Sequence, residues 1–345
     1  MRAAVLYGKE DVRLESVPER ALTPGEVRVD IRAALTCGTD LKVFKRGYHA
    51  RMLRPPCTFG HEFAGVLSEV TPEAIGWSVG DRVVAANSAP CGHCPSCQRC
   101  QEQLCDDLLF LNGAYAESIV VPARIVEKNL LRVRSSTEFA DAALVEPLAC
   151  VVQGVHDLAL QPGERVLVIG AGPIGLMFVA LARAAHCDVT LAGRGESRLK
   201  KGWRLGATAI ADVAGKEDLV GAIREGAPNS GAFDVVIECV GQPAVWEAAV
   251  VLVRKGGRVN FFGGCPSGTT VTFDTTLLHY SALTLLASFH HTPRTIRRAL
   301  LHIEAGTIRA ADFVDGLTAL SELPSLFRAM TAGNRAVKTL INVRG

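Results

Sequence analysis

Apolar and polar residues alternate in short runs along the first 150 residues of this 345-residue chain. Runs such as EVRVDIRA and EFAGVLSEV are separated by turns that are rich in proline and glycine. Alternation with a period of two is typical of strands that bury one face. The pattern therefore predicts a β-rich first domain.

After residue 150 the apolar runs lengthen and take on two alternating forms. ERVLVIG predicts a buried strand, GAGPIG a tight turn and LMFVALARAA a helix, and a second buried strand, CDVTLAG, follows. Strands that alternate with helices form parallel sheets covered by helices. Residues 151–289 are therefore predicted to form an α/β domain with a doubly wound parallel sheet of the Rossmann type.

The last part of the chain is predicted to complete the first domain. RTIRRALLHIEAG has the spacing of a helix, and AVKTLINV predicts a final strand that returns to the N-terminal part. The expected division is thus a β-rich domain from residues 1–150 and 290–345, with residues 151–289 as the second domain. No internal repeat interrupts this organisation.

Composition and charge exclude several classes of protein. The chain carries 37 Lys and Arg residues against 35 Asp and Glu residues, so the excess of positive charge expected of a nucleic-acid-binding protein is missing. No apolar run is long enough to cross a bilayer, and the N-terminal residues alternate like a strand rather than forming the apolar block of a signal peptide. We therefore expect a cytoplasmic protein with no nucleic-acid partner and no membrane partner.

Five cysteines fall within residues 91–105, and cytosolic cysteines are more often metal ligands or core residues than disulfides. Four of them have the spacing C-x2-C-x2-C-x7-C, which favours a closed tetrahedral zinc site. An iron–sulfur cluster can also use four thiolates, but the familiar ferredoxin spacings differ from this one. Unliganded thiols this dense would oxidise, and a nucleic-acid zinc ribbon would be expected to hold its pairs farther apart. The four are Cys91, Cys94, Cys97 and Cys105, with Cys100 left over.

Three further motifs contain residues that bind metals in other proteins. Cys37, in LTCGTD, follows a strand-like run at a glycine turn, and His61 and Glu62, in TFGHEFAG, follow a glycine where a loop meets a strand. Glu146, in ALVEPLAC, lies in an apolar stretch where a carboxylate needs a partner. A lone cysteine or histidine is more often a core residue, but these positions favour a second metal site.

The motifs CGTD, GHE, EPLA and GAGPIG and the four-cysteine segment occur in an order and at separations that resemble a known family. This family is the zinc-dependent medium-chain dehydrogenase/reductases, and the likeness is to its polyol branch, the sorbitol- or threonine-dehydrogenase-like enzymes. The resemblance covers nearly the whole chain. It implies a GroES-like fold for the β-rich catalytic domain and a homodimer or homotetramer.

The resemblance also assigns roles to the candidate metal ligands. Cys37 and His61 would bind a catalytic zinc, with Glu62 and Glu146 as the carboxylates that complete or exchange in its shell. Cys91, Cys94, Cys97 and Cys105 would hold a structural zinc. The implied reaction is hydride transfer between NAD(P) and a secondary alcohol or ketone, with a polyol or sugar-like substrate.

The path of the substrate proton is only partly implied. Thr39 would hydrogen-bond the alkoxide that the zinc stabilises and pass its proton outward, although a threonine that only shapes the turn is the alternative. Members of the family often have a histidine five residues after the zinc cysteine, and this sequence has Lys42 there. The outer proton path therefore stays open.

The cofactor site is predicted at the glycine-rich turn. Gly170, Gly172 and Gly175 follow a predicted strand and, with Ile174, open a predicted helix, where backbone N–H groups bind a pyrophosphate. The next predicted strand ends in Gly193-Arg194, where NAD enzymes place a carboxylate on the ribose.

The basic residue at that strand end favours NADP over NAD, because Arg194 would bind a 2′-phosphate. Arg198 is a second candidate for cofactor binding, although relatives that use NAD resemble it there. In the alternative arrangement Arg194 faces solvent and Glu196 reaches the ribose, which leaves NAD open.

Two other function classes remain to be compared with the dehydrogenase. One is a metal-stabilised binding protein that keeps the fold and the cofactor without turnover, and the other is a zinc-free enone reductase of the same superfamily. The intact set of candidate catalytic residues argues against both: Cys37, Thr39, His61, Glu62 and Glu146.

Overall fold

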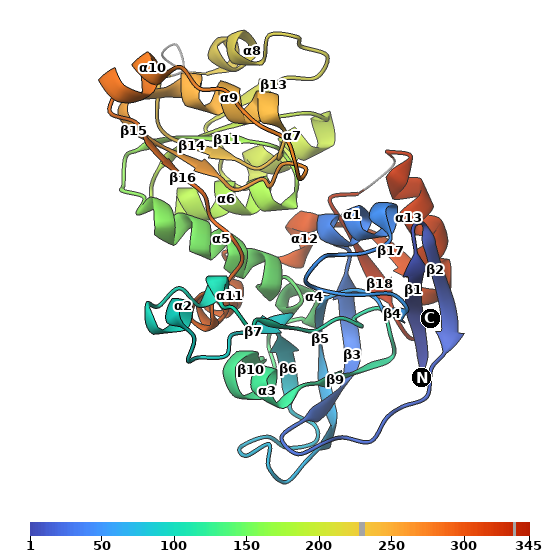
Figure 1. Ribbon diagram of the computed structural model, residues 1–345. Helices are drawn as coiled ribbons and strands as arrows, with labels where there is room; N and C mark the ends of the chain where they lie inside the picture. Colours follow the sequence, from blue (N-terminus) through green and yellow to red (C-terminus); the bar gives the residue numbers. More distant parts are fainter. Residues whose placement is uncertain (228–231, 334–335) are drawn as a thin grey trace. The chain divides into compact units, whose positions relative to one another are not determined.

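The computed structural model describes residues 1–227, 232–333 and 336–345, and the chain divides into two compact units (Figure 1). Unit 1 comprises Met1–Ala149 and His291–Gly345, and unit 2 comprises Cys150–His290. The boundary after Ala149 falls within one helix, α5 (Val145–Leu158).

Unit 1 is built on a seven-stranded sheet in the order β10-β6-β5-β3-β18-β17, with β9 also paired to β3. All of its pairs are antiparallel except β17 with β18. The strands are β3 (Val27–Leu35), β5 (Glu62–Val70), β6 (Arg82–Ala85), β9 (Ser118–Val121), β10 (Leu130–Arg132), β17 (Val314–Ala319) and β18 (Lys338–Asn342).

Two smaller sheets and several short helices complete unit 1. The three-stranded sheet has β2 (Asp11–Ser16), β1 (Arg2–Gly8) and β4 (Cys57–Thr58), and the two-stranded sheet has β7 (Ser88–Ala89) and β8 (Leu109–Phe110). The helices are α1 (Gly38–Arg46), α2 (Pro95–Gln98), η1 (Glu102–Leu104), α3 (Ala123–Asn129), α4 (Phe139–Ala142), α11 (Pro293–Glu304), α12 (Ala310–Phe313), η3 (Leu320–Glu322) and α13 (Leu323–Thr331).

The core of unit 1 joins residues from both ends of the chain. Strand β18 pairs with β3, as the apolar run near the C-terminus predicts, with Leu340 opposite Leu35. Phe327 of α13 lies 5.3 Å from the ring of Phe44 and 5.4 Å from that of Phe59, measured between centroids. Residues after 290 therefore hold the N-terminal sheet together, and the end of β3, which leads to Cys37, lies beside them.

Unit 2 has a six-stranded sheet in the order β13-β12-β11-β14-β15-β16, and every pair in it is parallel. The strands are β11 (Arg165–Ile169), β12 (Asp188–Gly193), β13 (Ala209–Asp212), β14 (Phe233–Glu238), β15 (Val253–Phe261) and β16 (Thr284–Leu286). Its helices besides the end of α5 are α6 (Pro173–Ala184), α7 (Glu196–Arg204), α8 (Leu219–Gly226), α9 (Pro243–Leu252) and α10 (Thr275–Tyr280).

This sheet is the predicted doubly wound sheet of the Rossmann type. The strand order reverses between β11 and β14, and ligands of such sheets bind outside the carboxyl ends of the strands at that switch point. Val166, Leu167 and Val168 of β11 are fully buried, as expected of a strand that is covered on both faces. The turn that follows β11 is therefore at the place where a dinucleotide is expected.

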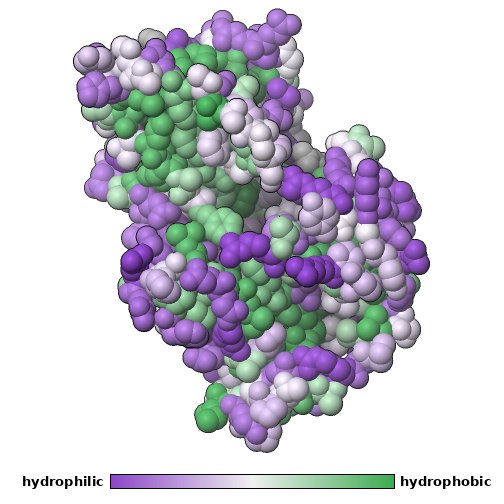
Figure 2. Space-filling model, in the orientation of Figure 1, coloured by the Kyte–Doolittle hydropathy of each residue, from purple (hydrophilic) through white to green (hydrophobic). Residues whose placement is uncertain are grey.

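The surface mixes polar and apolar side chains. On the face drawn in Figure 2, hydrophilic side chains cover much of the surface and apolar patches remain between them. Trp203, Tyr280 and Leu317 are among the large apolar side chains that stay exposed. Among the helices of the described residues, none combines the length and the apolar character that a membrane crossing requires.

Candidate metal centres and dinucleotide site

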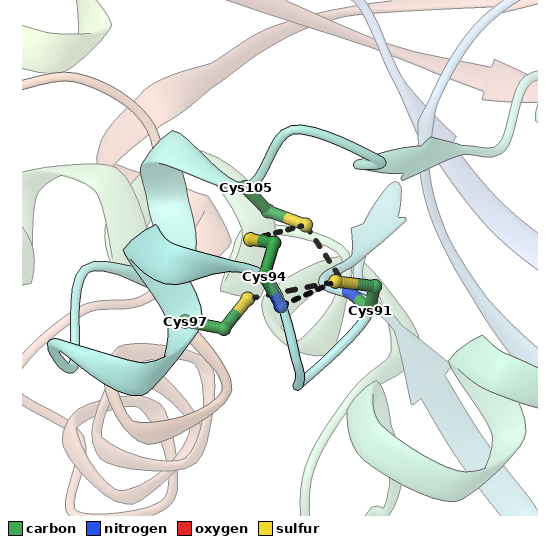
Figure 3. A group of neighbouring side chains, drawn as sticks. All are labelled: Cys91, Cys94, Cys97 and Cys105. Carbon is green, nitrogen blue, oxygen red and sulfur yellow. Dashed lines mark hydrogen bonds between the residues drawn. The ribbon is translucent and has the colours of Figure 1, made fainter.

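The four cysteines of the C-x2-C-x2-C-x7-C segment converge in unit 1 (Figure 3). Their sulfur atoms all lie within 4.8 Å of one another, with 4.0 Å between the sulfurs of Cys91 and Cys97 and 3.9 Å between those of Cys94 and Cys105. A disulfide would need about 2.05 Å. Four ligands at a tetrahedral zinc, each at about 2.3 Å, lie about 3.8 Å apart. The spacing therefore fits four thiolates around one ion.

Backbone N–H groups donate hydrogen bonds to the sulfur atoms of this cluster, which stabilises thiolates. The N–H of Cys91 donates to the sulfur of Cys105 at 3.2 Å, and the N–H of Cys94 donates to the sulfur of Cys91 at 3.4 Å. The backbone N–H groups of Asp106 and Cys97 lower the pKa of Cys94 to about 6, whereas burial raises the pKa of Cys97 to about 12. Four neighbouring thiols cannot all ionise without a cation, so the arrangement suits a divalent ion.

Cys100, the fifth cysteine of the segment, is not part of the cluster. It is exposed, and its backbone has a positive φ of 58°. The spacing of the sequence distinguishes it correctly from the other four.

A second group of possible ligands lies beyond the end of β3 and at the start of β5. Ligand atoms of Cys37, His61 and Glu62 all lie within 4.8 Å of one another. Cys37 caps α1, and its sulfur accepts the N–H of Thr39 at 3.4 Å. Glu62 is the first residue of β5 and lies opposite Leu35, so the antiparallel pairing of the two strands brings the three residues together.

The ring of His61 is held from behind by a buried carboxylate. Its Nδ1 lies 2.8 Å from Oδ1 of Asp40, and both side chains are buried. Burial disfavours the charged ring, but the charges of Asp40 and Cys37 outweigh it and raise the pKa of His61 well above its usual value. The surroundings of this histidine therefore attract a cation, and with Nδ1 bonded to Asp40 its Nε2 is the atom available to a metal.

Glu62 is paired with a lysine from the last strand. The Nζ of Lys338 donates to both carboxylate oxygens of Glu62, at 2.7 and 2.5 Å, and to the carbonyl of Thr36 at 3.0 Å. Burial raises the pKa of Glu62 although the Lys338 charge opposes it, and the Glu62 charge raises the pKa of Lys338 although burial opposes it. The charge of the Glu62 carboxylate is thus balanced by Lys338. To bind a metal ion, Glu62 would have to use an oxygen that already accepts a hydrogen bond from Lys338.

The two remaining candidates of this centre stand apart from the three ligands. Thr39 lies half-buried in the first turn of α1, two residues after Cys37. Glu146, in the first turn of α5, lies outside the group of Cys37, His61 and Glu62. Burial raises the pKa of Glu146 to about 7, and its Oε1 lies 3.9 Å from Nε2 of His291. The structure therefore brings three of the four predicted ligands together.

The glycine-rich turn of unit 2 has the geometry that its sequence predicts. Gly170 follows β11 with a φ of 120°, and Gly172 caps the N-terminus of α6. A Cβ on Gly175 would lie 1.8 Å from the carbonyl oxygen of Gly170, so only glycine fits there. Ile174 lies beside it in the first turn of α6. The turn and the helix start thus leave backbone N–H groups open to an anion.

The end of β12 approaches this turn closely. A Cβ on Gly193 would lie 2.5 Å from the Cβ of Ala171, which explains a glycine at the end of the strand. Arg194 is exposed just after it, and Arg198 is half-buried in α7. Glu196 pairs with Lys200 at 2.5 Å, one turn along α7. The carboxylate that is nearest in sequence to Arg194 is thus bonded within its own helix.

Comparisons with known proteins match both units. A family model described as the alcohol dehydrogenase GroES-like domain matches residues 23–130, and one described as zinc-binding dehydrogenase matches residues 173–305. D-altritol 5-dehydrogenase of Agrobacterium fabrum is 33% identical over 95% of this chain and 95% of its own. The chain belongs to the zinc-dependent medium-chain dehydrogenase/reductases.

Other members of the family agree with this placement. Sorbitol dehydrogenase of Bacillus subtilis is 26% identical over 99% of this chain and 97% of its own. A Sinorhizobium meliloti protein, whose structure with NADP is described as that of a zinc-binding dehydrogenase, has a TM-score of 0.88 and 29% identity over 99% of this chain and 98% of its own.

These findings confirm several predictions from the sequence. They confirm the fold class and the polyol-dehydrogenase-like branch of the family. They also confirm the enzyme class, a zinc-dependent, NAD(P)-linked oxidoreductase that acts on polyol-like alcohols. The comparisons therefore disfavour the two alternative function classes, a binding protein that keeps the fold without catalysis and a zinc-free enone reductase.

Three residues around the group of Cys37, His61 and Glu62 were not singled out from the sequence: Asp40, Lys338 and Tyr115, whose hydroxyl donates to Asp40 at 2.5 Å. Asp40 stands in the CGTD motif itself, so its position three residues after Cys37 was available as a clue. Tyr115 and Lys338 lie far away in the chain, in segments whose patterns indicate only strands and turns. Their contribution depends on the fold.

We expect alanine substitutions at two glycines of the dinucleotide turn to have different effects, one on stability and the other on cofactor binding. Gly175→Ala forces a methyl group against the backbone and should lower the free energy of unfolding by about 1–3 kcal/mol. At Gly172 an added Cβ meets nothing within 4 Å and φ is −82°. Gly172→Ala should therefore keep the melting temperature but weaken cofactor binding, because the second glycine lets the backbone approach the pyrophosphate.

Thermal unfolding and titration with NADPH fluorescence measure the two effects. A wild-type melting temperature for Gly175→Ala, or a wild-type cofactor dissociation constant for Gly172→Ala, would contradict the assignment of the turn.

Proposed function

We propose that this chain is a zinc-dependent, NADP-linked dehydrogenase that interconverts a secondary alcohol of a polyol or sugar-like substrate with its ketone. The observation that carries the proposal is the convergence of Cys37, His61 and Glu62, backed by the buried partners Asp40 and Lys338. A thiolate, an imidazole and a carboxylate are a donor set that suits zinc with an open position.

Cys37 and His61 would hold the catalytic zinc, and Glu62 and Glu146 would complete or exchange in its shell. A zinc ion bound there supplies Lewis acidity, which stabilises the negative charge that develops on the substrate oxygen as hydride leaves. Thr39 would accept the proton of the substrate hydroxyl at its own oxygen while it releases its hydroxyl proton outward, toward solvent. Lys42 is exposed on α1, in solvent, and stands where the relatives often have a histidine.

The second zinc is assigned to Cys91, Cys94, Cys97 and Cys105. The sulfur distances fit a closed tetrahedral site, and a closed site serves stability rather than chemistry. The segment around it contains only the short elements α2 and η1, so it has little apolar core of its own.

The preference for NADP is supported by three features. No carboxylate ends β12, Arg194 is exposed at that position, and Glu196 is paired with Lys200. A relative with 29% identity was solved with NADP. Gly170, Gly172, Ile174 and Gly175 would hold the pyrophosphate, and Gly193, Arg194 and Arg198 would line the ribose and its phosphate.

We assign residues 1–150 and 290–345 to a GroES-like catalytic domain and residues 151–289 to the Rossmann domain. A homodimer or homotetramer is supported by β16, which ends the sheet of unit 2 and leaves one backbone edge open among the described residues. A cytoplasmic location is supported by eleven free cysteines, since zinc-binding thiolates need a reducing compartment.

The purified enzyme is expected to carry two zinc ions per chain and to oxidise a polyol with NADP. Cys37→Ser should lower the zinc content to one ion, abolish turnover and leave a folded protein that still binds NADPH, because a catalytic zinc is dispensable for the core. Metal analysis and a polyol screen at 340 nm, roughly the absorbance maximum of the reduced nicotinamide, check this. Unchanged zinc content together with unchanged turnover would refute the catalytic site.

The cysteine segment offers a matched pair of substitutions. Cys97→Ser removes a ligand of the structural zinc and should lower the melting temperature by roughly 5 °C or more, the shift that about 2 kcal/mol produces in a chain of this size. Cys100→Ser, at the exposed cysteine, should be nearly silent. A large loss in Cys100→Ser and none in Cys97→Ser would show that the ligands were misassigned.

The choice of cofactor is tested at the end of β12. Arg194→Asp removes the partner of the 2′-phosphate and adds a repelling charge, so the ratio of kcat/KM for NADP to that for NAD should fall about 10- to 100-fold. Arg204→Asp, at another exposed arginine of unit 2, is the control for a change of net charge and should leave the ratio unchanged. A wild-type enzyme that strongly prefers NAD would refute the proposal.

A further inference from the structure

The hydroxyl of Tyr115 lies behind the carboxylate that supports His61. It donates to Oδ2 of Asp40 at 2.5 Å, and the other oxygen of Asp40 faces Nδ1 of His61 at 2.8 Å. Tyr115 is fully buried, and Asp40 and His61 are nearly so. The three side chains therefore form one continuous hydrogen-bonded line that ends at a proposed ligand of the catalytic zinc.

The single proton of the Tyr115 hydroxyl has two acceptors within reach. The carbonyl of Leu35 lies at 3.2 Å, and the carboxylate of Asp40 at 2.5 Å. A charged acceptor at the shorter distance forms the stronger bond, so the hydroxyl of Tyr115 donates to Asp40. Burial and the charge of Asp40 also raise the pKa of Tyr115 well above its usual value, which keeps the hydroxyl protonated as a donor.

The direction of the line fixes the tautomer of the histidine. With one oxygen occupied by Tyr115, Asp40 presents its other oxygen as an acceptor to Nδ1 of His61. Nδ1 then carries a proton in either charge state of the ring, and Nε2 is the atom that can give its lone pair to a metal.

Backbone hydrogen bonds and ring packing hold Tyr115 in place. Its backbone N–H donates to the carbonyl of Phe59 at 2.9 Å, and its carbonyl accepts from Ala4 at 2.8 Å. The ring packs edge-on against Phe59, and a Cβ on Gly60 would lie 2.6 Å from it. Gly60 directly precedes His61, so the same side chain fixes both the approach of the backbone and the carboxylate behind the ring.

We propose that Tyr115 is a positioning residue for the catalytic zinc, which it serves by orienting Asp40 and, through Asp40, the ring of His61. The inference rests on the proposed function, because it takes Cys37 and His61 as ligands of that zinc. Tyr115 acts through its bond to Asp40, and its contribution is to reduce the freedom of the ligand before the ion binds.

The test measures the zinc affinity of the full-length enzyme. Zinc is withdrawn from wild type and from Tyr115→Phe by competition with a chromophoric chelator, and the four-cysteine zinc serves as an internal reference. We expect the catalytic zinc to bind about tenfold more weakly in Tyr115→Phe, at the low end of the 10- to 100-fold effects of outer-sphere partners. The reference site should be unchanged.

A matched control removes a different tyrosine hydroxyl from the same unit. Tyr7, in β1, donates to the carboxylate of Glu15 at 3.0 Å in an exposed position. Tyr7→Phe therefore deletes the same chemical contact away from His61 and should leave both zinc affinities unchanged. Both phenylalanine variants keep the ring, so the packing of each tyrosine is retained.

A double-mutant cycle separates the hydroxyl from the packing. Asp40→Asn should weaken the catalytic zinc more than Tyr115→Phe does, and adding Tyr115→Phe to Asp40→Asn should then cost little. An equal loss from Tyr115→Phe in both backgrounds would show that the hydroxyl acts through Leu35 or the packing, and would overturn the inference. When cobalt replaces the catalytic zinc, the visible spectrum of Tyr115→Phe should be shifted relative to that of the wild type. The spectrum of Tyr7→Phe should not be shifted.

The outcomes distinguish the inference from the proposed function. A wild-type enzyme that binds only one zinc per chain refutes the catalytic centre itself. A wild type with two zinc ions, together with an unchanged chelator competition in Tyr115→Phe, refutes the role of Tyr115 and leaves the proposed function standing. A lower melting temperature of the metal-free variant with unchanged zinc affinity would assign Tyr115 to the core only, which also overturns the inference.

Discussion

The buried ion pair between Glu62 and Lys338 is the interaction on which the group of Cys37, His61 and Glu62 depends. Both side chains are almost completely buried, and breaking such a pair leaves an uncompensated charge at a cost of about 3–5 kcal/mol. Lys338 comes from the last strand, β18, and Thr339 beside it bonds twice to Thr36, next to Cys37. The C-terminal strand thus helps to position the proposed metal ligands of the N-terminal sheet. Three acidic side chains, Cys37, Asp40 and Glu62, thus surround the single Lys338, an arrangement that suits a divalent cation.

The two units achieve accuracy at their sites by different physical means. In unit 2 the backbone itself is the binding surface, so the accuracy comes from glycines that allow close approach, as at Gly175 and Gly193. In unit 1 the ligands are side chains, and their accuracy comes from buried partners that remove rotational freedom, Asp40 for His61 and Lys338 for Glu62. Each solution follows from the chemistry required, because an anion binds to N–H groups whereas a metal ion binds to lone pairs.

The sequence predicts the parts of the sites whose residues are close together in the chain. The cysteine spacing distinguishes Cys100 from the four clustered thiols, and the turn after β11 has the conformation that its glycines require. The order of the seven strands in unit 1 and the roles of Tyr115 and Lys338 could not be predicted, because these contacts join residues 75 and 276 positions apart. Resemblance to a family supplied Glu146 as a ligand, but its distance from Cys37 and His61 depends on packing that no motif records.

The two proposed metal centres differ in how much of the fold must form before their ligands come together. The four cysteines lie within one short segment and are supported by backbone N–H groups of that segment, so their geometry needs only local structure. Cys37, His61 and Glu62 meet only when β3 pairs with β5, and they are supported only when Tyr115 and β18 have also packed. Contacts between distant residues form late because their loop closure must first be offset by other contacts. Metal affinity at the proposed catalytic centre should therefore depend on the packing of distant segments of unit 1, whereas affinity at the proposed four-cysteine site should depend mainly on its own segment.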